Sequence, residues 1–74
     1  MSTLRGVYDR HGEQFGYLDG SALYDLDDNQ TGTLRDGVIY SLDGERRWIV
    51  KGETLCTLKG EPIGYFGAPY IDEE

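Results

Sequence analysis

The sequence repeats itself every 16 residues, and this period constrains the fold more than any other feature of the chain. Residues 6–21, 22–37, 38–53 and 54–69 align without a gap, and a remnant follows them. Two columns of the alignment are apolar in every copy, as expected when neighbouring repeats bury a shared core. The first column holds Val7, Leu23, Ile39 and Leu55, continued by Ile71, and the second holds Leu18, Leu34, Val50 and Phe66.

Each block has the length of a β-hairpin, because sixteen residues accommodate two strands of about five residues and two tight turns. Asp-Gly pairs indicate type I′ turns, in which both central residues have positive φ. Helical spacing of apolar residues is absent, and glycine interrupts every window, so we expect essentially no helix. The first turns are predicted at His11-Gly12, Asp27-Asp28, Asp43-Gly44 and Lys59-Gly60, and the second at Asp19-Gly20, Asp36-Gly37, Lys51-Gly52 and residues 67–69.

The predicted fold is all-β, with four tandem two-stranded hairpins related by pseudo-four-fold symmetry. An isolated hairpin is marginal in water, so the copies must pack on one another. A closed flower-like ring or small barrel removes the strand edges that an open sheet exposes. Residues 70–72 repeat the opening-strand pattern and are predicted as a short closing strand. The chain, residues 1–74, is then a single domain.

The core of so short a chain is thin, since at this length folding buries only about 60% of the extended chain's surface. Cys56 is the single cysteine, which excludes an intramolecular disulfide and a cysteine-rich zinc site. Stability must therefore come from regular packing or from self-association. The expected core is Val7, Leu18, Leu23, Leu34, Ile39, Val50, Leu55, Phe66 and Ile71.

The unit Y-D-x-x-G-x-x-x-G-Y, seen from Tyr8-Asp9 through Gly12 to Gly16-Tyr17, resembles the repeat of small bacterial proteins described as the four-fold β-flower family. The resemblance covers residues 6–72. It implies four hairpin petals around a pseudo-four-fold axis and brings no established activity. Departures at Thr33, Trp48 and Cys56 predict distortion of the third and fourth petals. The motif also resembles YD repeats of bacterial shells and choline-binding repeats, whose units are longer and usually richer in Trp.

The formal charge of -7 and the pI near 4.4 make nucleic acid and membranes poor partners, because both carry negative charge. Met1 to Leu4 lack a basic segment followed by an apolar run, and no apolar stretch approaches the roughly 20 residues that span a bilayer. The default expectation is a cytoplasmic protein, and the unpaired thiol agrees with it.

Two features are candidate binding sites. The tyrosine column, Tyr8, Tyr24 and Tyr40, offers an aromatic ring for a sugar, a cation or a flat ligand. The alternative is that these rings pack between petals with their hydroxyls at the surface. Trp48 occupies a column that is otherwise glycine. It either fills a space between petals or stands exposed as an interface anchor, preceded by Arg46 and Arg47.

The remaining polar residues are explained by turns. Asp25, Asp27 and Asn29 have the spacing of a calcium loop, but Gln30 stands where the sharp turn needs glycine, so neither metal nor cofactor is expected. His11, the single histidine, sits in a predicted turn without a catalytic partner. The column Asp9, Asp25, Ser41 and Thr57 is expected to bind backbone groups one or two residues on.

These observations favour a protein that is not an enzyme. The leading hypothesis is a non-enzymatic interaction or assembly module with an unknown protein partner, or with itself as a homo-oligomer. The alternative is a small-ligand or carbohydrate-binding module that uses Tyr8, Tyr24 and Tyr40. Cys56, within a predicted strand, is expected to be a buried structural thiol.

Overall fold

The computed structural model describes residues 2–68 and 70–72, and their secondary structure consists of strands and turns without a helix. The strands follow the expected alternation, in which neighbouring side chains point to opposite faces. They are β1 (Ser2–Asp9), β2 (Gln14–Asp19), β3 (Ala22–Asp25), β4 (Gln30–Arg35), β5 (Val38–Ser41), β6 (Arg46–Lys51), β7 (Thr54–Cys56), β8 (Pro62–Phe66) and β9 (Tyr70–Asp72).

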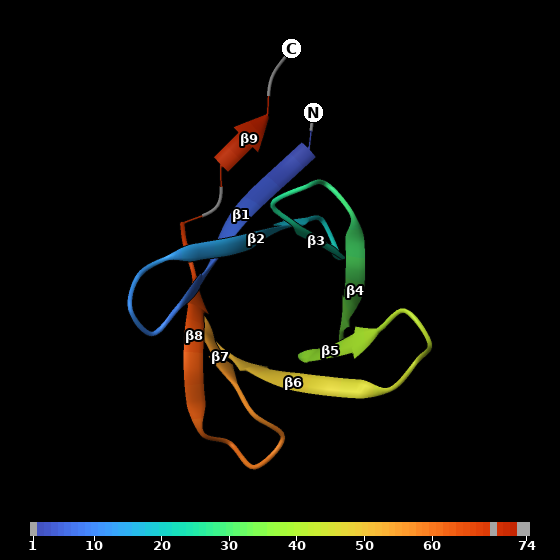
Figure 1. The fold of residues 1–74 in the computed structure, drawn as a ribbon, viewed down its shortest axis with the longest axis vertical. Coiled ribbons are helices and arrows are strands. Elements are labelled where there is room, and N and C mark those ends of the chain that lie inside the picture. The colour runs from blue at the N-terminus through green and yellow to red at the C-terminus, as the bar shows by residue number, and fades with distance from the viewer. Residues whose placement is uncertain (1, 69, 73–74) are drawn as a thin grey trace.

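The first eight strands form a closed antiparallel barrel. Each strand pairs with the next along the chain, and β1 pairs with both β2 and β8, which completes the ring. Figure 1 shows this ring, with the four longer turns pointing outward on four sides. The predicted all-β class and its closure are therefore confirmed. Residues 70–72 do form a strand, but it pairs with Ser2 to Leu4 of β1, and the ring of eight closes without it.

The strand register shifts at four places that are 16 residues apart: at Val7/Tyr8, Leu23/Tyr24, Ile39/Tyr40 and Leu55/Cys56. At each place the facing strand carries one extra residue, a β-bulge, which increases strand twist and helps a small sheet to curl. The bulge residues, which pair with no residue on the facing strand, are Phe15, Thr31, Arg47 and Ile63.

The four longer turns lie where the sequence predicts them, but their type differs from the prediction. In the first, the Gly12 amide donates to the Asp9 carbonyl, and the Asp9 amide donates to the Glu13 carbonyl. Positive φ occurs at Gly12 and not at His11. This is a type I turn followed by a left-handed residue, so the predicted type I′ geometry is wrong here. The equivalent left-handed residues in the other three turns are Asp28, Gly44 and Gly60.

Among the shorter turns at the opposite end of the barrel, the turn at Asp36-Gly37 matches the prediction. Asp36 and Gly37 both have positive φ, 52° and 78°, as a type I′ turn requires. Pairing of Asp19 with Ala22 and of Lys51 with Thr54 puts the neighbouring turns at 20–21 and 52–53, one residue later than predicted. Residue 69 of the predicted turn at 67–69 lies outside the described residues.

Side chains from both apolar columns fill the interior of the barrel and form its core. Because alternate residues of a strand face the same way, the aliphatic column and the second apolar column point inward from successive strands. Ile39, Leu55 and Val7 are almost fully enclosed, while Leu34 and Val50 are half-buried. The side chain of Ile71 lies outside the described residues. Confirmed core residues are Val7, Leu18, Leu23, Ile39, Leu55 and Phe66.

Trp48 changes the pairing of one pair of neighbouring strands. In the three equivalent places, a Cβ atom on Gly16, Gly32 or Gly64 would overlap the carbonyl oxygen of a tyrosine on the next strand. Glycine there allows the backbones to approach, and the strands pair as far as Gly16 with Asp25 or Gly32 with Ser41. Between β6 and β7 the pairing instead stops at Ile49 with Cys56. The pairing of β6 with β7 is thus shorter at Trp48 than the pairing at the three glycine positions.

Candidate functional site

The end of the barrel that carries the four longer turns has an open mouth. Alternate connections of an up-and-down barrel lie at one end, and the bulge residues stand next to these turns. A cavity of about 230 Å³ opens among strands β2 to β6. Its walls combine core residues, bulge residues and the start of a turn: Phe15, Leu23, Tyr24, Asp25, Thr31, Ile39, Arg47 and Trp48.

Trp48 forms one side of this mouth. It is half-buried, packs against the core cluster and pairs across the strands with Ile39. The guanidinium carbon of the exposed Arg47 lies 4.8 Å from the centre of the Trp48 ring, which is a cation–π contact. The packing agrees with the interpretation that Trp48 fills space beside the core. Its role as an interface anchor stays a prediction.

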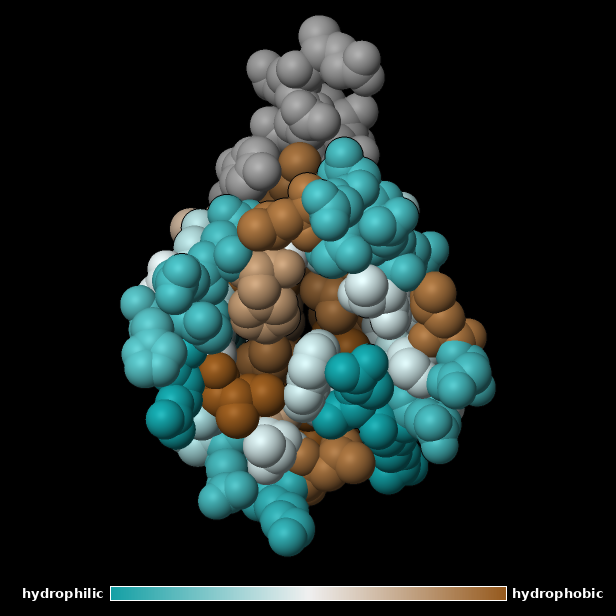
Figure 2. Space-filling model, viewed as in Figure 1, coloured by the Kyte–Doolittle hydropathy of each residue, from teal (hydrophilic) through white to brown (hydrophobic). Residues whose placement is uncertain are grey.

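Leucine side chains stand exposed at the tips of three of the longer turns. Leu26, Leu42 and Leu58 are 58%, 64% and 50% exposed, and they occupy the same position of the 16-residue period. The fourth turn has Arg10 at this position. Figure 2 shows that apolar surface borders part of a hollow near the barrel axis, while most of the rim of the molecule is hydrophilic.

The tyrosine column does not form a ring around the barrel axis. Each tyrosine follows an inward-facing aliphatic residue, so its side chain leaves the opposite face of the strand. The Tyr8 ring stacks on Tyr65 and the Tyr24 ring stacks on Tyr17, with centroids 5.2 Å apart in both pairs. Tyr24 also lines the mouth cavity together with Trp48, while Tyr40 lines a separate groove.

That second groove lies on the outer face of strands β4 and β5. It has a volume of about 210 Å³, and its walls are Thr33, Arg35, Tyr40, Ser41, Leu42 and Gly44. The Arg35 guanidinium carbon lies 4.8 Å from the centre of the Tyr40 ring. Threonine at position 33 stands where the equivalent positions of the first and fourth copies hold Tyr17 and Tyr65. Only Tyr8 of the predicted site residues lines neither hollow among the described residues.

The polar column at the start of the longer turns binds backbone amides. An Asp25 carboxylate oxygen accepts hydrogen bonds from the amides of Asp27 and Asn29, both at 2.9 Å. Asp9 accepts in the same way, and the Ser41 and Thr57 hydroxyls replace the carboxylate in the other two turns. The predicted role in turns is confirmed, although the bonds reach two and four residues on.

Electrostatic shifts in the described residues arise from these turns. The Glu13 and Asn29 amides lower the pKa of Asp9 and Asp25 respectively, because they donate to the ionised carboxylates. The Ser41 hydroxyl likewise lowers the pKa of Asp43. Turn geometry is therefore the first cause of each of these three shifts.

One tyrosine hydroxyl is also shifted. The Tyr17 hydroxyl donates to an Asp28 carboxylate oxygen at 2.7 Å, which raises the pKa of Tyr17 to about 12. The hydrogen bond and the carboxylate's charge both favour the protonated phenol. Tyr17 thereby joins strand β2 to the tip of the next turn.

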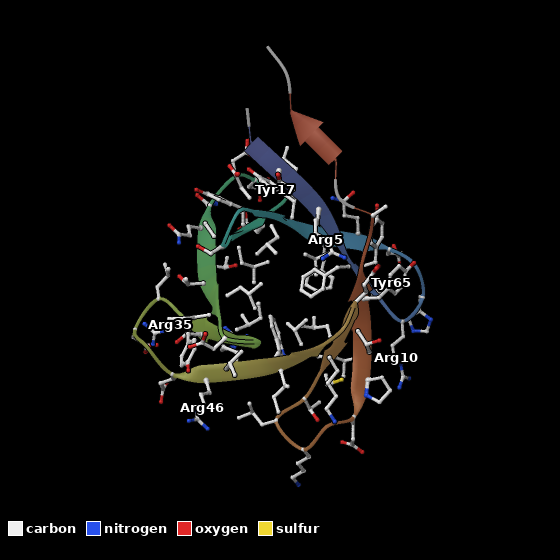
Figure 3. The ribbon with its side chains drawn as sticks, turned by 180° about the vertical axis from the view of Figure 1, so that it is seen from behind. Arg5, Arg10, Tyr17, Arg35, Arg46 and Tyr65 are labelled. Atoms are coloured by element: carbon white, nitrogen blue, oxygen red, sulfur yellow. The ribbon has the colours of Figure 1, made fainter. Side chains whose placement is uncertain are left out.

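Arg5 occupies the interior at the other end of the barrel. Its Nε donates to the Gly67 carbonyl at 3.0 Å, and its guanidinium carbon lies 5.3 Å from the centre of the Phe66 ring. An ion pair of 3.4 Å joins it to Glu53. Figure 3 shows Arg5 pointing into the ring, while Arg10, Arg35 and Arg46 lie around its outside. This end is therefore filled by a basic side chain, unlike the open mouth.

The described residues contain no group of three His, Cys, Asp or Glu side chains placed to hold a metal ion. Cys56 is buried, as predicted for a structural thiol. His11 is exposed at the tip of the first turn. Neither side chain lines one of the two hollows.

The sequence interpretation missed the bulge residues and the exposed leucines. Phe15, Thr31 and Arg47 share one position of the 16-residue period. The signal at this position is its mixture of apolar and polar residue types. Leu26, Leu42 and Leu58 carry a clearer signal, because turn tips are normally polar and small. Leucine at these tips is therefore not explained by turn geometry.

These features define a small eight-stranded antiparallel barrel that has an apolar mouth and a groove on its outer face. No family model, curated protein or solved structure matches the chain. Across residues 2–68 and 70–72, no helix has the length and hydrophobicity needed to cross a membrane.

Proposed function

We propose that the chain is a non-enzymatic protein-interaction module that receives one hydrophobic side chain of a partner protein in the mouth of its barrel. The observation that carries this proposal is the mouth cavity itself, in which Phe15, Ile39 and Trp48 provide apolar walls. Tryptophan and arginine are the residue types that most often contribute strongly to protein interfaces, and here Arg47 stacks on Trp48.

The size of the cavity favours an occupant as small as one side chain over a drug-sized molecule. Pockets for drug-sized molecules usually measure about 300–1,000 Å³. The mouth measures about 230 Å³ and is open to solvent, so an aliphatic or aromatic side chain matches it better. Leu26, Leu42 and Leu58 add exposed apolar side chains at the turn tips, which a protein partner could also contact.

Support for a non-enzymatic role comes from the shifted titratable groups. The pKa values of Asp9, Asp25 and Asp43 are lowered first by turn hydrogen bonds, and that of Tyr17 is raised first by Asp28. Each shift has a structural cause in a hairpin turn, and none of these groups requires a reaction to explain it.

We also propose that the four hairpins are related by pseudo-four-fold symmetry. The support is the recurrence of the same register shift at Val7, Leu23, Ile39 and Leu55. The same turn hydrogen bonds also recur from Asp9, Asp25, Ser41 and Thr57 to the residue four positions on. Such symmetry would present a partner with four similar longer turns, and three of these turns carry an exposed leucine at the tip.

The experiment replaces Phe15 with a photo-cross-linking phenylalanine derivative and irradiates the cells that naturally make the protein. We expect a defined partner protein to be cross-linked from position 15 and not from Thr3, an exposed residue of β1 that does not line the mouth. Trp48→Ala should remove the cross-link, because it deletes one wall of the cavity. The folded state of each variant is checked by its thermal unfolding curve.

Three results would count against the proposal in different ways. Equal cross-linking from Thr3 and Phe15 would mean that contact is non-specific. Retention of the cross-link in a folded Trp48→Ala variant would mean that the mouth does not recognise the partner. Cross-links exclusively between copies of the chain, with a dimer in sedimentation at the same concentration, would replace a separate partner by a homo-oligomer.

The alternative of a ligand site built from the whole tyrosine column has less support. Tyr8 and Tyr24 each have one ring face covered by another tyrosine. The three column tyrosines line no common hollow among the described residues. A carbohydrate ring recognised jointly by Tyr8, Tyr24 and Tyr40 would therefore require a different arrangement of these side chains.

A further inference from the structure

The outer face of the barrel has two tyrosine stacks and one place where such a stack is incomplete. Tyr17 lies opposite Tyr24 between β2 and β3, and Tyr65 lies opposite Tyr8 between β8 and β1. The ring planes are within 10° and 12° of parallel, respectively. Tyr40 has the same position in the repeat as Tyr24, but its partner across the strands is Thr33.

The hydroxyl end of each complete stack lies against the left-handed residue of the adjacent longer turn. The Tyr17 hydroxyl donates to Asp28, and the Tyr65 hydroxyl lies 3.7 Å from the place where a Cβ atom on Gly12 would stand. Gly44 is the corresponding residue beside Tyr40, and its φ of 92° is close to the 84° of Gly12. The third place thus has Tyr40 and the turn that would border a second phenol hydroxyl, but threonine stands at position 33 instead of a second tyrosine.

The groove of about 210 Å³ occupies this incomplete place. Thr33 and Tyr40, which pair across β4 and β5, both line it, and so does Gly44 of the adjacent turn. Leu42 and Ser41 of the same turn also line it. A tyrosine side chain at position 33 would therefore extend into this groove.

We propose that this groove binds a small molecule with a single planar phenol ring, which stacks on Tyr40 and directs its hydroxyl toward the turn at Gly44. Flat aromatic rings gain from offset stacking in addition to the burial of apolar area. The two complete stacks within the same chain show that this backbone geometry accommodates parallel rings 5.2 Å apart. The site is on the outer face and is independent of the function proposed for the barrel mouth.

Arg35 is the side chain that already touches the Tyr40 ring, and its guanidinium carbon lies 4.8 Å from the ring centre. Arg35 is exposed, so its side chain can move aside, and cation–π contacts at exposed sites are weak. The expected effect of Arg35→Ala is therefore unchanged or tighter binding of a neutral phenol.

The fourth place on the outer face provides an internal comparison. Between β6 and β7, Ile49 lies opposite Cys56, and neither side chain is aromatic. Aromatic stacking cannot occur there. A phenol is therefore expected to bind beside Tyr40 and not beside Cys56.

The experiment titrates the protein with p-cresol, which is the tyrosine side chain as a free molecule, and follows the backbone amide signals by NMR. The expected dissociation constant is on the order of 1–10 mM, as for a ligand of so few atoms. Saturable shifts should concentrate at Thr33, Tyr40 and Gly44. The saturated analogue 4-methylcyclohexanol should bind at least about five-fold more weakly, since it lacks an aromatic face.

Two variants at one position decide the result. Thr33→Tyr fills the groove from within the chain and should abolish the p-cresol shifts, whereas Thr33→Val leaves the groove open and should retain them. Both variants are first shown to be folded by their dispersed amide spectra. Retained binding in Thr33→Tyr, equal binding of 4-methylcyclohexanol, or shifts that map to the mouth around Trp48 would each overturn the proposal. If p-cresol shifted signals only at the mouth, the phenol site would be disproved, but the protein interaction proposed for the mouth would not be contradicted.

Discussion

Tyr40 faces Thr33 across strands β4 and β5, whereas Tyr24 at the equivalent place faces the ring of Tyr17. The chain therefore contains an internal comparison. The position opposite Tyr24 holds an aromatic ring, whereas the equivalent position opposite Tyr40 holds none. Because the register shift and the turn hydrogen bonds beside Tyr24 and Tyr40 are the same, a change at Thr33 tests the effect of one ring with little else altered.

Thr33→Tyr is expected to stabilise the protein, because it completes the missing stack on Tyr40. The gain should be about 0.5–1.5 kcal/mol in the free energy of unfolding, the usual value of an aromatic pair beyond simple burial. Urea unfolding followed by Trp48 fluorescence measures it. Thr33→Val is the matched control, since it keeps a β-branched residue without adding a ring. A Thr33→Tyr variant no more stable than Thr33→Val would mean that the groove cannot hold a ring.

Ile39→Ala is expected to destabilise the barrel by about 2–5 kcal/mol, as for other large-to-small changes of buried aliphatic residues. Ile39 is 1% exposed and belongs to the central cluster. Leu42, three residues further on, is 64% exposed, so Leu42→Ala should change stability by less than about 0.5 kcal/mol. Guanidinium unfolding of both variants measures the contrast. A loss below about 1 kcal/mol for Ile39→Ala would place Ile39 outside the core.

The inward face of the barrel could be predicted from the sequence because both apolar columns recur with a fixed period. Val7 and Leu23 belong to one column and Leu18 and Phe66 to the other, and all four are buried. The same alternation places Tyr8 and Tyr24, one residue after Val7 and Leu23, on the opposite face of the strand. The same pattern that identified the core therefore also directs the tyrosine side chains away from it.

The mouth could not be predicted, because it depends on bulges and on strand pairing. Phe15 and Arg47 reach the mouth because each is the extra residue of a bulge, and a bulge is defined by the register between two strands. Turn type escaped prediction for a related reason. Asp43-Gly44 has the composition of a type I′ turn, but the adjacent bulge requires a type I turn with one left-handed residue.

Gly32→Ala is expected to destabilise the protein, although alanine normally suits a strand better than glycine. A Cβ atom at residue 32 would overlap the Tyr40 carbonyl oxygen, so the strands must separate locally. The expected cost is on the order of 1–3 kcal/mol, as for overpacked positions. Hydrogen exchange should show faster exchange near Ser41, which pairs with Gly32. The shortened pairing beside Trp48 shows the form that this separation takes.

The control for this variant is Thr33→Ala, which changes the next residue of the same strand without a backbone overlap. It should leave exchange near Ser41 close to that of the unmodified protein. If Gly32→Ala instead raised stability, the close approach of β4 and β5 would not depend on glycine, and Trp48 would not explain the shortened pairing of β6 with β7.

Alkaline pH should weaken the protein through Tyr17. Its pKa rises from the ordinary 10.0 to about 12 in the folded state, mainly through the hydrogen bond to Asp28. A raised folded pKa stabilises the fold below the unfolded pKa, and this contribution is lost as the pH rises from about 10 through about 12. Tyr17→Phe lacks the titrating group, so the stability difference between the two proteins should decrease over this range.

Two measurements check this pH dependence. Urea unfolding at several pH values between 9 and about 12 gives the stability difference directly. Absorbance at the phenolate band should show that one tyrosine of the folded protein titrates late and that Asp28→Asn, which keeps a residue tolerant of positive φ and removes the charge, brings it back toward the ordinary pKa. A difference between Tyr17→Phe and the unmodified protein that stays constant up to the highest pH would mean that the hydroxyl does not hold Asp28 in solution.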